Sequence, residues 1–476
     1  MFINGEWIQA ENNKVFSVTD PADNSEIAKV ADGGAKEVDL AIDGAFKAFD
    51  AWSKTTAYQR ADFLCKAHTL MMDNLEHLAQ TMTREQGKPI GAARNEVRYG
   101  ADFLSWFAEE AKRNYGRTIP SARADQRFMV LKQPMGVVGA VTPWNYPVSM
   151  ITRKLAPALA AGCTMVIKPA EATPLCAIEL FKIFEQAGLP RGVANLVTTL
   201  DPGPVGEAFC TDPRVAKLTF TGSTAVGRML ASKAALQIKR ISLELGGHAP
   251  FIVCRDANPV TAAKGLCLVK FLNTGQACIS PNRIYVHVSR KEAFLRELAA
   301  KVSVMKAGRG TAPGVGIGPL VNGAALEKVE NQVSDALDHG ATLIAGGKRL
   351  TRDGLGKGWF YAPTILDNVT ENMLIYREET FGPVAPVIAY EDENDLLRMA
   401  NDTHYGLAAY VYTRDIAGAF KMFEGLKFGI IGINDINPTS AAAPFGGMKE
   451  SGLGREGAAE GMDEYLETKL GGFSLR

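Results

Sequence analysis

The chain has 476 residues, with 52 Lys and Arg against 52 Asp and Glu, and a hydrophobic fraction of 46%. This length provides for about three compact units with substantial cores, which excludes an intrinsically disordered or a small disulfide-stapled protein. Zero net charge gives no overall field that would gather nucleic acid or an anionic membrane surface, so a small molecule is the expected partner.

Long amphipathic helices are predicted near the start of the chain. Apolar residues recur there at helical spacing over residues 36–52 and 58–85. Short β-branched or aliphatic runs follow and predict strands at 136–142, 164–168, 194–198 and 217–221. A helical pattern comes after each run. Buried strands that alternate with helices indicate a parallel, doubly wound α/β sheet with ligands at the carboxyl ends of its strands.

The same alternation restarts after Gly246 and predicts a second α/β domain. Its expected strands cover residues 250–254, 283–287, 342–345, 385–389 and 428–433. Between the two patterns, residues 117–134 indicate an extended ribbon that fits neither domain cleanly.

The cysteines and the apolar runs bear on location. Seven cysteines are spread singly without a C-x-x-C pair, which argues against a disulfide framework or a zinc site and favours a reducing cytoplasm. The first residues, 1–7, show no export or transit signature. The longest apolar stretch, 155–167, is well short of the ~20 residues that span a bilayer. We therefore expect neither a metal site nor a membrane partner.

Two glycine-rich segments are candidates for binding a dinucleotide phosphate. Residues 452–457 form a G-x-G-x-x-G, but a loop precedes them instead of a strand, so we interpret this match as a decoy. Residues 217–228 run from a strand through Gly222 and Ser223 into a helix that contains Gly227, an arrangement whose free N–H groups suit a phosphate. An ordinary capped turn is the alternative for this segment.

Three polar side chains stand in settings that suit catalysis. Asn145 lies between two prolines, and a pre-oriented amide is what a developing oxyanion needs. Glu244 ends an apolar run before a Gly pair, where desolvation would raise its pKa toward that of a useful base. Cys278 lies among small residues after a glycine turn, as a reactive thiolate could. The alternatives are a proline-rich turn, a surface glutamate and an inert buried cysteine.

Taken together, the motifs resemble the NAD(P)-dependent aldehyde dehydrogenase superfamily along essentially the whole chain, with succinate-semialdehyde dehydrogenases closest in pattern. The segments that carry the resemblance occur in the family's order, at 143–147, 167–171, 220–224, 243–247, 275–278, 378–383 and 444–447.

The resemblance implies a subunit in three parts. These are a Rossmann-like NAD-binding domain of residues 1–116 and 136–247, an α/β catalytic domain of residues 248–447, and a small β oligomerisation element of residues 117–135 and 462–476. Family members are usually dimers or tetramers, so a homodimer or homotetramer is expected.

The resemblance also implies catalytic roles. Cys278 would attack the aldehyde carbonyl as a thiolate, while the Asn145 amide and the Cys278 backbone N–H would hold the oxyanion. Glu244 would activate the water that hydrolyses the thioester to a carboxylic acid. Glu456 matches a second, proton-relaying glutamate, with a surface carboxylate as the alternative, and Lys154 matches a lysine near the catalytic centre.

For the cofactor, the resemblance pairs Lys168 and Glu171 with the adenine ribose, Ser223 with the pyrophosphate, and Glu379 and Phe381 with the nicotinamide ribose and ring. A carboxylate beside the ribose would repel a 2′-phosphate, so Glu171 favours NAD, with NADP possible. The further cofactor-binding candidates are Thr142, Trp144, Gly222, Gly227 and Leu245.

Arg153 is the main clue to the substrate. It stands where many aliphatic aldehyde dehydrogenases carry an aromatic, and in succinate-semialdehyde dehydrogenases the matching arginine binds the substrate carboxylate, assisted by a serine that matches Ser440. Those enzymes often place a second arginine at the position of Leu272, so a longer ω-oxo acid such as glutarate semialdehyde stays open. Arg153 could instead pair with a protein carboxylate. Tyr146 and Phe445 complete the predicted substrate site.

Two other interpretations remain at this point. A broad aliphatic or betaine-type aldehyde dehydrogenase would use Arg153 structurally. Outside enzymes, the fold could have been recruited as a structural or binding protein, which the intact set of Cys278, Glu244 and Asn145 argues against.

Overall fold

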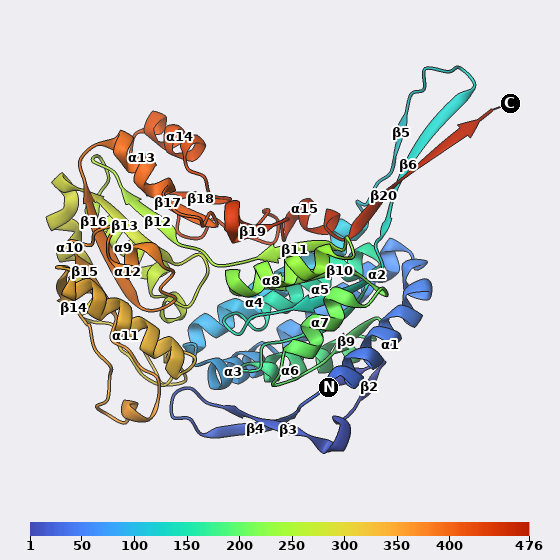
Figure 1. Cartoon of the computed structure of the whole chain (residues 1–476), viewed down its shortest axis with the longest axis horizontal. Helices are drawn as coiled ribbons and strands as arrows, with labels where there is room; N and C mark the ends of the chain where they lie inside the picture. The colour runs from blue at the N-terminus through green and yellow to red at the C-terminus, as the bar shows by residue number, and fades with distance from the viewer. Residues whose placement is uncertain (476) are drawn as a thin grey trace.

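A computed structural model describes residues 1–475, and within them two open, largely parallel sheets form two lobes (Figure 1). The first sheet has the strand order β19-β11-β10-β7-β8-β9-β1-β2. Its parallel strands are β7 (Val137–Val141), β8 (Thr164–Lys168), β9 (Ala194–Leu196), β10 (Val215–Thr221) and β11 (Arg240–Glu244). Its antiparallel strands are β1 (Phe2–Ile3), β2 (Glu6–Trp7) and β19 (Gly452–Leu453). This confirms the predicted doubly wound α/β sheet.

The second sheet has the order β14-β15-β16-β13-β12-β17-β18 and confirms the second α/β unit. Its strands are β12 (Ala249–Val253), β13 (Pro281–His287), β14 (Thr342–Ala345), β15 (Thr364–Asp367), β16 (Val384–Tyr390), β17 (Ala408–Tyr412) and β18 (Ile430–Ile433). The prediction of a buried parallel strand at 342–345 is wrong, because β14 is an edge strand antiparallel to β15 with mostly exposed side chains. The other predicted strands agree with the structure to within a few residues.

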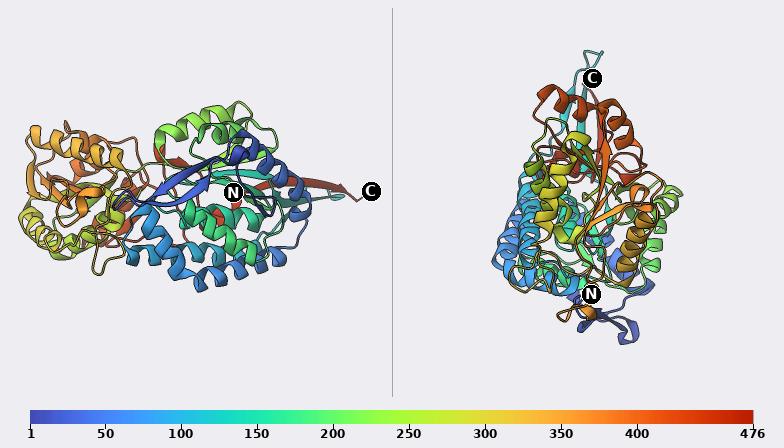
Figure 2. Two further views of the ribbon diagram at one scale, coloured as in Figure 1. Left: turned by 90° about the horizontal axis from the view of Figure 1, so that it is seen from below. Right: turned by 90° about the vertical axis from the view of Figure 1, so that its left-hand side faces the viewer.

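Helices cover both faces of each sheet (Figure 2). Those of the first lobe are α1 (Ala35–Ser53), α2 (Ala57–Asp73), α3 (Leu75–Gln86), α4 (Ile90–Ala111), α5 (Ser149–Ala161), α6 (Pro174–Gln186), α7 (Gly203–Thr211) and α8 (Thr224–Ala235). Those of the second are α9 (Pro259–Lys270), α10 (Val288–Val302), α11 (Gly323–Asp338), α12 (Leu374–Arg377), α13 (Glu393–Asn401) and α14 (Ile416–Gly425). The single helix expected over 58–85 is in fact α2 and α3, separated at Asn74, whose backbone leaves the helical conformation.

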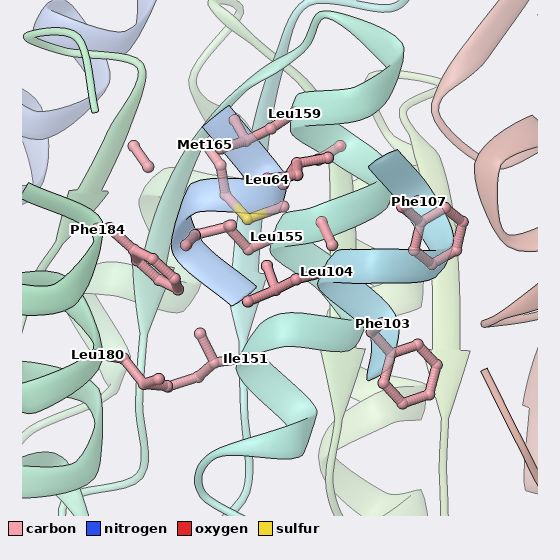
Figure 3. Close-up of a cluster of buried hydrophobic side chains, with 14 of the residues drawn as sticks. Leu64, Phe103, Leu104, Phe107, Ile151, Leu155, Leu159, Met165, Leu180 and Phe184 are labelled. Atoms are coloured by element: carbon pink, nitrogen blue, oxygen red, sulfur yellow. The ribbon is translucent and has the colours of Figure 1, made fainter. Parts of the chain in front are cut away.

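Helix α5 lies in the middle of the first lobe's core. Every residue from Ser149 to Ala161 is buried, and the apolar ones pack against α2, α4, α6 and β8. Figure 3 shows Leu155 of this helix among Leu64, Leu104 and Phe184. Because α5 is buried on all sides, its polar side chains have to find partners inside the protein.

A narrow sheet projects away from both lobes (Figure 1). It consists of β5 (Arg117–Ile119), β6 (Gln126–Pro134) and β20 (Leu466–Ser474), all antiparallel, so the extended ribbon pairs with the C-terminal strand. Of the C-terminal part of the expected oligomerisation element, residues 462–463 belong to α15 (Ala458–Asp463), and residue 476 lies outside the described residues. A hairpin of β3 (Val15–Thr19) and β4 (Glu26–Ala31) projects at the opposite side of the molecule.

The last part of the chain returns to the first lobe. Residues 452–457, the G-x-G-x-x-G interpreted above as a decoy, begin with β19, in which Gly452 pairs with Glu244 of β11. This segment thus serves as an edge strand and carries Glu456 back toward the core. No helix within residues 1–475 is long and apolar enough to cross a membrane.

Candidate active site

A cavity of about 350 Å³ lies between α4 and α5 of the first lobe and α9 of the second. The predicted nucleophile and most of the predicted substrate-binding residues line it, namely Cys278, Tyr146, Arg153, Leu272 and Phe445. Ser440 is placed differently: its side chain is exposed, and the neighbouring Thr439 lines the cavity instead. The cavity therefore brings together side chains that lie far apart in the sequence.

Cys278 is held by a tightly wound segment before β13. Asn273, Thr274 and Gly275 all have positive φ, which turns the chain sharply ahead of the cysteine. A Cβ on Gly247 would lie 2.2 Å from the Cys278 carbonyl oxygen, so two of the sequence motifs meet backbone to backbone here. Burial raises the pKa of Cys278 to about 12, although Arg153 lowers it in part. At rest the side chain is a neutral thiol.

Asn145 lies in the loop between β7 and α5 and is buried. Its amide Nδ2 donates to the carbonyl oxygen of Gln276, two residues before Cys278, at 3.2 Å. The amide is thus directed toward the segment that carries the thiol, which is the position an oxyanion donor requires.

Glu456 is buried between two cations of α5. Its carboxylate lies 2.9 Å from Arg153 Nε and 2.5 Å from Lys154 Nζ. Burial would raise the pKa of Glu456, but the charges of Lys154 and Arg153 outweigh it and hold the pKa below its usual range. Lys154 also donates to the Thr219 hydroxyl of β10 at 3.0 Å. The alternative of a surface carboxylate at Glu456 is wrong, since its exposure is only 5%.

The structure shows the alternative expected for Arg153, and its role toward a substrate carboxylate stays a prediction. It pairs with a protein carboxylate, Glu456, and it also lines the cavity. Its guanidinium lies 3.9 Å from the centre of the Phe445 ring, a distance typical of a cation–π contact. Its Nη2 is buried and has no hydrogen-bond partner among residues 1–475. That unused donor could bind an anion in the cavity.

Glu244 is the last residue of β11 and is 5% exposed. Neither of its carboxylate oxygens has a hydrogen-bond partner within the described part of the chain. Burial, and then the charge of Glu456, raise the pKa of Glu244 well above its usual range. A Cβ on Gly446 would lie 2.8 Å from Glu244 Oε1, which explains why a glycine stands beside it. Once ionised, such a carboxylate is a strong base.

The turn after β10 fits a phosphate group. Ser223 is the N-cap of α8, where its side chain accepts the Val226 N–H at 3.4 Å. A Cβ on Gly227 would lie 2.4 Å from Leu245 Cδ2, so the helix packs closely on the strand that ends at Glu244. The Gly222 N–H donates to the Glu244 carbonyl at 3.1 Å, which joins this turn to the end of β11.

The neighbouring strand ends carry further cofactor candidates. Lys168, at the end of β8, forms an ion pair of 2.9 Å with Glu171, whose side chain is 45% exposed. Burial would raise the pKa of Glu171, but the charge of Lys168 lowers it below its usual range. The Thr142 hydroxyl, after β7, is buried with no hydrogen-bond partner among the described residues. An orphaned hydroxyl and a capped helix start at one sheet edge are what a bound dinucleotide would use.

Residues of the second lobe face this edge. Glu379 accepts the Gly247 N–H at 2.8 Å, and burial raises its pKa to about 7. Phe381 has a positive φ of 55°, and its ring meets that of Trp144 at 5.6 Å, edge to face. The residues predicted to bind the nicotinamide thus lie at the junction between the two lobes.

Sequence reasoning missed Lys88 and Glu96, which also line the cavity. Both are buried and form an ion pair with each other. Lys88 follows a glycine in a polar loop, a pattern typical of a surface lysine, and its partners are distant in the sequence. No local pattern could have identified it.

The comparisons with known proteins agree with this geometry. A family model described as "Aldehyde dehydrogenase family" matches residues 7–470. The chain is 48% identical over 467 residues, 98% of this chain and 96% of the relative, to a succinate-semialdehyde dehydrogenase (NADP(+)) of Escherichia coli. It is 48% identical over 475 residues to a glutarate-semialdehyde dehydrogenase of Pseudomonas aeruginosa, covering 99% and 97% of the two chains. A crystal structure of an E. coli NADP-dependent enzyme superposes with a TM-score of 0.98 at 48% identity, covering 100% of this chain and 98% of the other.

Proposed function

Since this chain belongs to the aldehyde dehydrogenase family, we propose that it oxidises a carboxylated semialdehyde, such as succinate or glutarate semialdehyde, to the dicarboxylate with NAD(P). The observation that carries the choice of substrate is Arg153, a buried guanidinium with an unused donor on the wall of the Cys278 cavity.

The first half of the reaction forms a covalent intermediate on Cys278. The Cys278 thiol releases its proton to solvent water, its sulfur adds to the aldehyde carbonyl carbon, and the Asn145 amide donates to the resulting oxyanion. Lys168, Glu171 and Ser223 would hold NAD(P), which when bound would supply the hydride acceptor for this oxidation.

The second half hydrolyses the thioester. Glu244, after losing its own proton to solvent, takes a proton from a water molecule, whose oxygen attacks the thioester carbon and releases the carboxylic acid from the Cys278 sulfur. Glu456, the expected proton relay, can accept that proton in turn, and its ion pair with Lys154 holds it in place. Lys154 and Arg153 lower the pKa of Glu456, whereas burial and the charge of Glu456 raise the pKa of Glu244, so the two carboxyls favour opposite protonation states.

The substrate assignment is tested by NADH formation with a panel of aldehydes. We expect succinate and glutarate semialdehyde to give a higher kcat/KM than propanal, benzaldehyde or betaine aldehyde. A preference for propanal or betaine aldehyde would instead support the broad aliphatic or betaine-type alternative. Failure to form NADH or NADPH with any of these aldehydes would support a binding role.

For the cofactor, we propose a preference for NAD. Glu171 would accept hydrogen bonds from the ribose hydroxyls and repel a 2′-phosphate. The E. coli relative named above as NADP(+)-dependent makes the direct comparison necessary. A kcat/KM with NADP equal to or above that with NAD would contradict the preference.

We also propose that the protein is a homo-oligomer and that it works in the cytoplasm. The separate sheet of β5, β6 and β20 supports an oligomerisation element of residues 117–135 and 462–476 in a homodimer or homotetramer. The division into a cofactor domain (1–116 and 136–247) and a catalytic domain (248–447) follows the two sheets. All seven cysteines are free, which suits the reducing cytoplasm.

A further inference from the structure

A buried ion pair that the proposed mechanism does not use lies on the wall of the same cavity. Lys88, in the loop between α3 and α4, pairs with Glu96 of α4, and both side chains are 1% exposed. Removing two charges from water is costly, and such a pair seldom stabilises a fold better than apolar packing would. The contacts of the Lys88–Glu96 pair therefore indicate a role other than stabilising the fold.

Lys88 reaches the residue that carries the predicted oxyanion donor. Its Nζ donates to the Asn145 carbonyl oxygen at 2.9 Å and lies 3.9 Å from the centre of the Tyr146 ring. Asn273 Nδ2 donates to the same carbonyl oxygen at 3.0 Å. Asn145 is thus held through its backbone by two donors and through its side chain by the Gln276 carbonyl.

Glu96 holds the other end of the same loop. Its Oε1 accepts the N–H groups of Val148 and Ser149, at 3.0 and 3.2 Å. These groups lie at the start of α5, where backbone donors have no partner within the helix. One ion pair therefore fixes the loop from Asn145 to Ser149 at both ends, and with it the start of the helix that carries Arg153.

Lys88 has no donor left for a ligand. Its Nζ already contacts three groups, namely the Glu96 carboxylate, the Asn145 carbonyl oxygen and the face of the Tyr146 ring, which match the three donors of an ammonium. Arg153 differs, because its Nη2 has no partner in the described chain. Lys88 therefore contacts only groups of the protein, whereas Arg153 has a donor that can bind the substrate.

We propose that Lys88 and Glu96 are positioning residues of the dehydrogenase reaction, which place the Asn145 amide where the oxyanion forms. This inference rests on the proposed function. The role concerns the reacting carbonyl and is independent of any carboxylate at the far end of the substrate.

The first test compares substrates. Lys88→Met removes the charge and the donors but keeps an unbranched chain, and it should lower kcat/KM about ten- to hundredfold, as small misplacements of a catalytic group do. The loss should be equal for succinate semialdehyde and propanal and should fall on kcat more than on KM. Rates are referred to active sites titrated by the NADH burst, so that unfolded protein is not counted. A loss confined to the semialdehyde would assign Lys88 to substrate binding and overturn the proposal.

The decisive test is a cycle with Asn145→Ala. If Lys88 acts through Asn145, Lys88→Met should change kcat/KM less than about twofold once the amide is absent, because interacting sites are not additive. The same fold-loss in both backgrounds would show that Lys88 acts by another route.

Controls separate positioning from general destabilisation. Arg60→Met removes another buried cation, whose Nε donates to the Ala160 carbonyl at 2.8 Å near the far end of α5. It should lower the melting temperature but leave the rate per titrated site unchanged. If Lys88→Met does not fold, two other variants replace it in the cycle with Asn145→Ala. One is Lys88→Arg, and the other is Lys88→Met/Glu96→Gln, which leaves no unpaired buried carboxylate. An inactive wild-type chain would refute the proposed function itself, whereas an active wild type with an equally active Lys88 variant refutes only the positioning role.

Discussion

Cys278 has the surroundings of a nucleophile but rests as a neutral thiol, since burial raises its pKa to about 12. Below that pKa the thiolate fraction, and with it the alkylation rate, rises about tenfold per pH unit. We expect iodoacetamide to label Cys278 slowly at neutral pH and ever faster up to about pH 10, as measured by intact mass. Cys278→Ser gives the background from the other cysteines. A rate that levels off below about pH 8 would contradict the neutral resting state.

Arg153 should distinguish carboxylated from uncharged aldehydes. Arg153→Leu removes a desolvated partner for the substrate carboxylate, which should cost about 2–4 kcal/mol in kcat/KM for succinate semialdehyde and much less for propanal. Glu456→Gln is the matched control, because it removes the other half of the Arg153 pair but keeps the guanidinium. It should slow both substrates by a similar factor. Equal losses on both substrates in Arg153→Leu would refute the carboxylate role.

Glu244 should be needed for turnover but not for the first hydride transfer. Glu244→Gln cannot activate water, so we expect a burst of NADH followed by little further product, seen in stopped-flow absorbance. Steady turnover at the wild-type rate would remove Glu244 from the role of base.

The same variant tests the raised pKa of Glu244 through stability. A carboxyl whose pKa is higher when folded stabilises the protein below its unfolded pKa, and this contribution is lost as pH rises toward the folded pKa. As pH rises above the ordinary glutamate pKa of about 4.3, the melting temperature of the wild type should therefore fall more than that of Glu244→Gln. If the melting temperatures of the two proteins vary with pH in the same way, the pKa of Glu244 is not raised by folding.

The sequence identifies residues whose neighbours along the chain are distinctive, and it misses those defined by distant contacts. Cys278 and Asn145 stand within short motifs, and the structure brings their segments together through Gln276. Lys88 has no such motif, because its partner Asn145 lies 57 residues further along the chain. Ser440 shows the opposite error. The family motif points to Ser440 as a substrate-binding residue, but in the structure its neighbour Thr439 lines the cavity instead.

At the scale of elements, the contact between Gly247 and the Cys278 segment sets the geometry of the site. Gly247→Ala places a methyl group 2.2 Å from the Cys278 carbonyl oxygen, so the nucleophile segment has to move. A displacement of about 1 Å can cost about a hundredfold in rate. We expect kcat to fall by that order with a smaller change in melting temperature. Gly91→Ala in α4, where a Cβ meets nothing within 4 Å, is the control and should leave kcat unchanged.

Periodicity predicts elements well where one face is buried and poorly elsewhere. The strands β7, β8 and β10 are almost wholly buried and are predicted from their β-branched and aliphatic residues, whereas β11, in which Arg240 is exposed and Glu244 buried, breaks that pattern. Helix α5 is a second case in which periodicity does not predict which side chains are buried. It is buried on every side, so Arg153 and Lys154 cannot be assigned to a solvent-facing stripe from the sequence.

At the scale of the whole molecule, each lobe supplies a different part of the site. The first lobe contributes Asn145, Glu244 and the α5 cations, and the second contributes Cys278 and Glu379. The C-terminal segment joins them, since β19 pairs with β11 and leads to Glu456. The site is complete only when all three segments are in place, so we expect local unfolding at the lobe junction to abolish activity before the lobes themselves unfold.

The projecting sheet leads to a prediction about assembly. Met129, Leu131 and Phe473 are each between 43% and 53% exposed, and the pairing of β6 with β20 places them on one face. Contiguous apolar side chains on a narrow, isolated sheet are typical of an interface. If this face joins subunits, Met129→Asp/Leu131→Asp should convert the oligomer to monomers in light scattering, with unchanged circular dichroism. Val304→Asp, at an 81% exposed position beyond α10, should leave the mass unchanged. A monomeric wild type, or a double variant that stays oligomeric, would remove this sheet from the assembly.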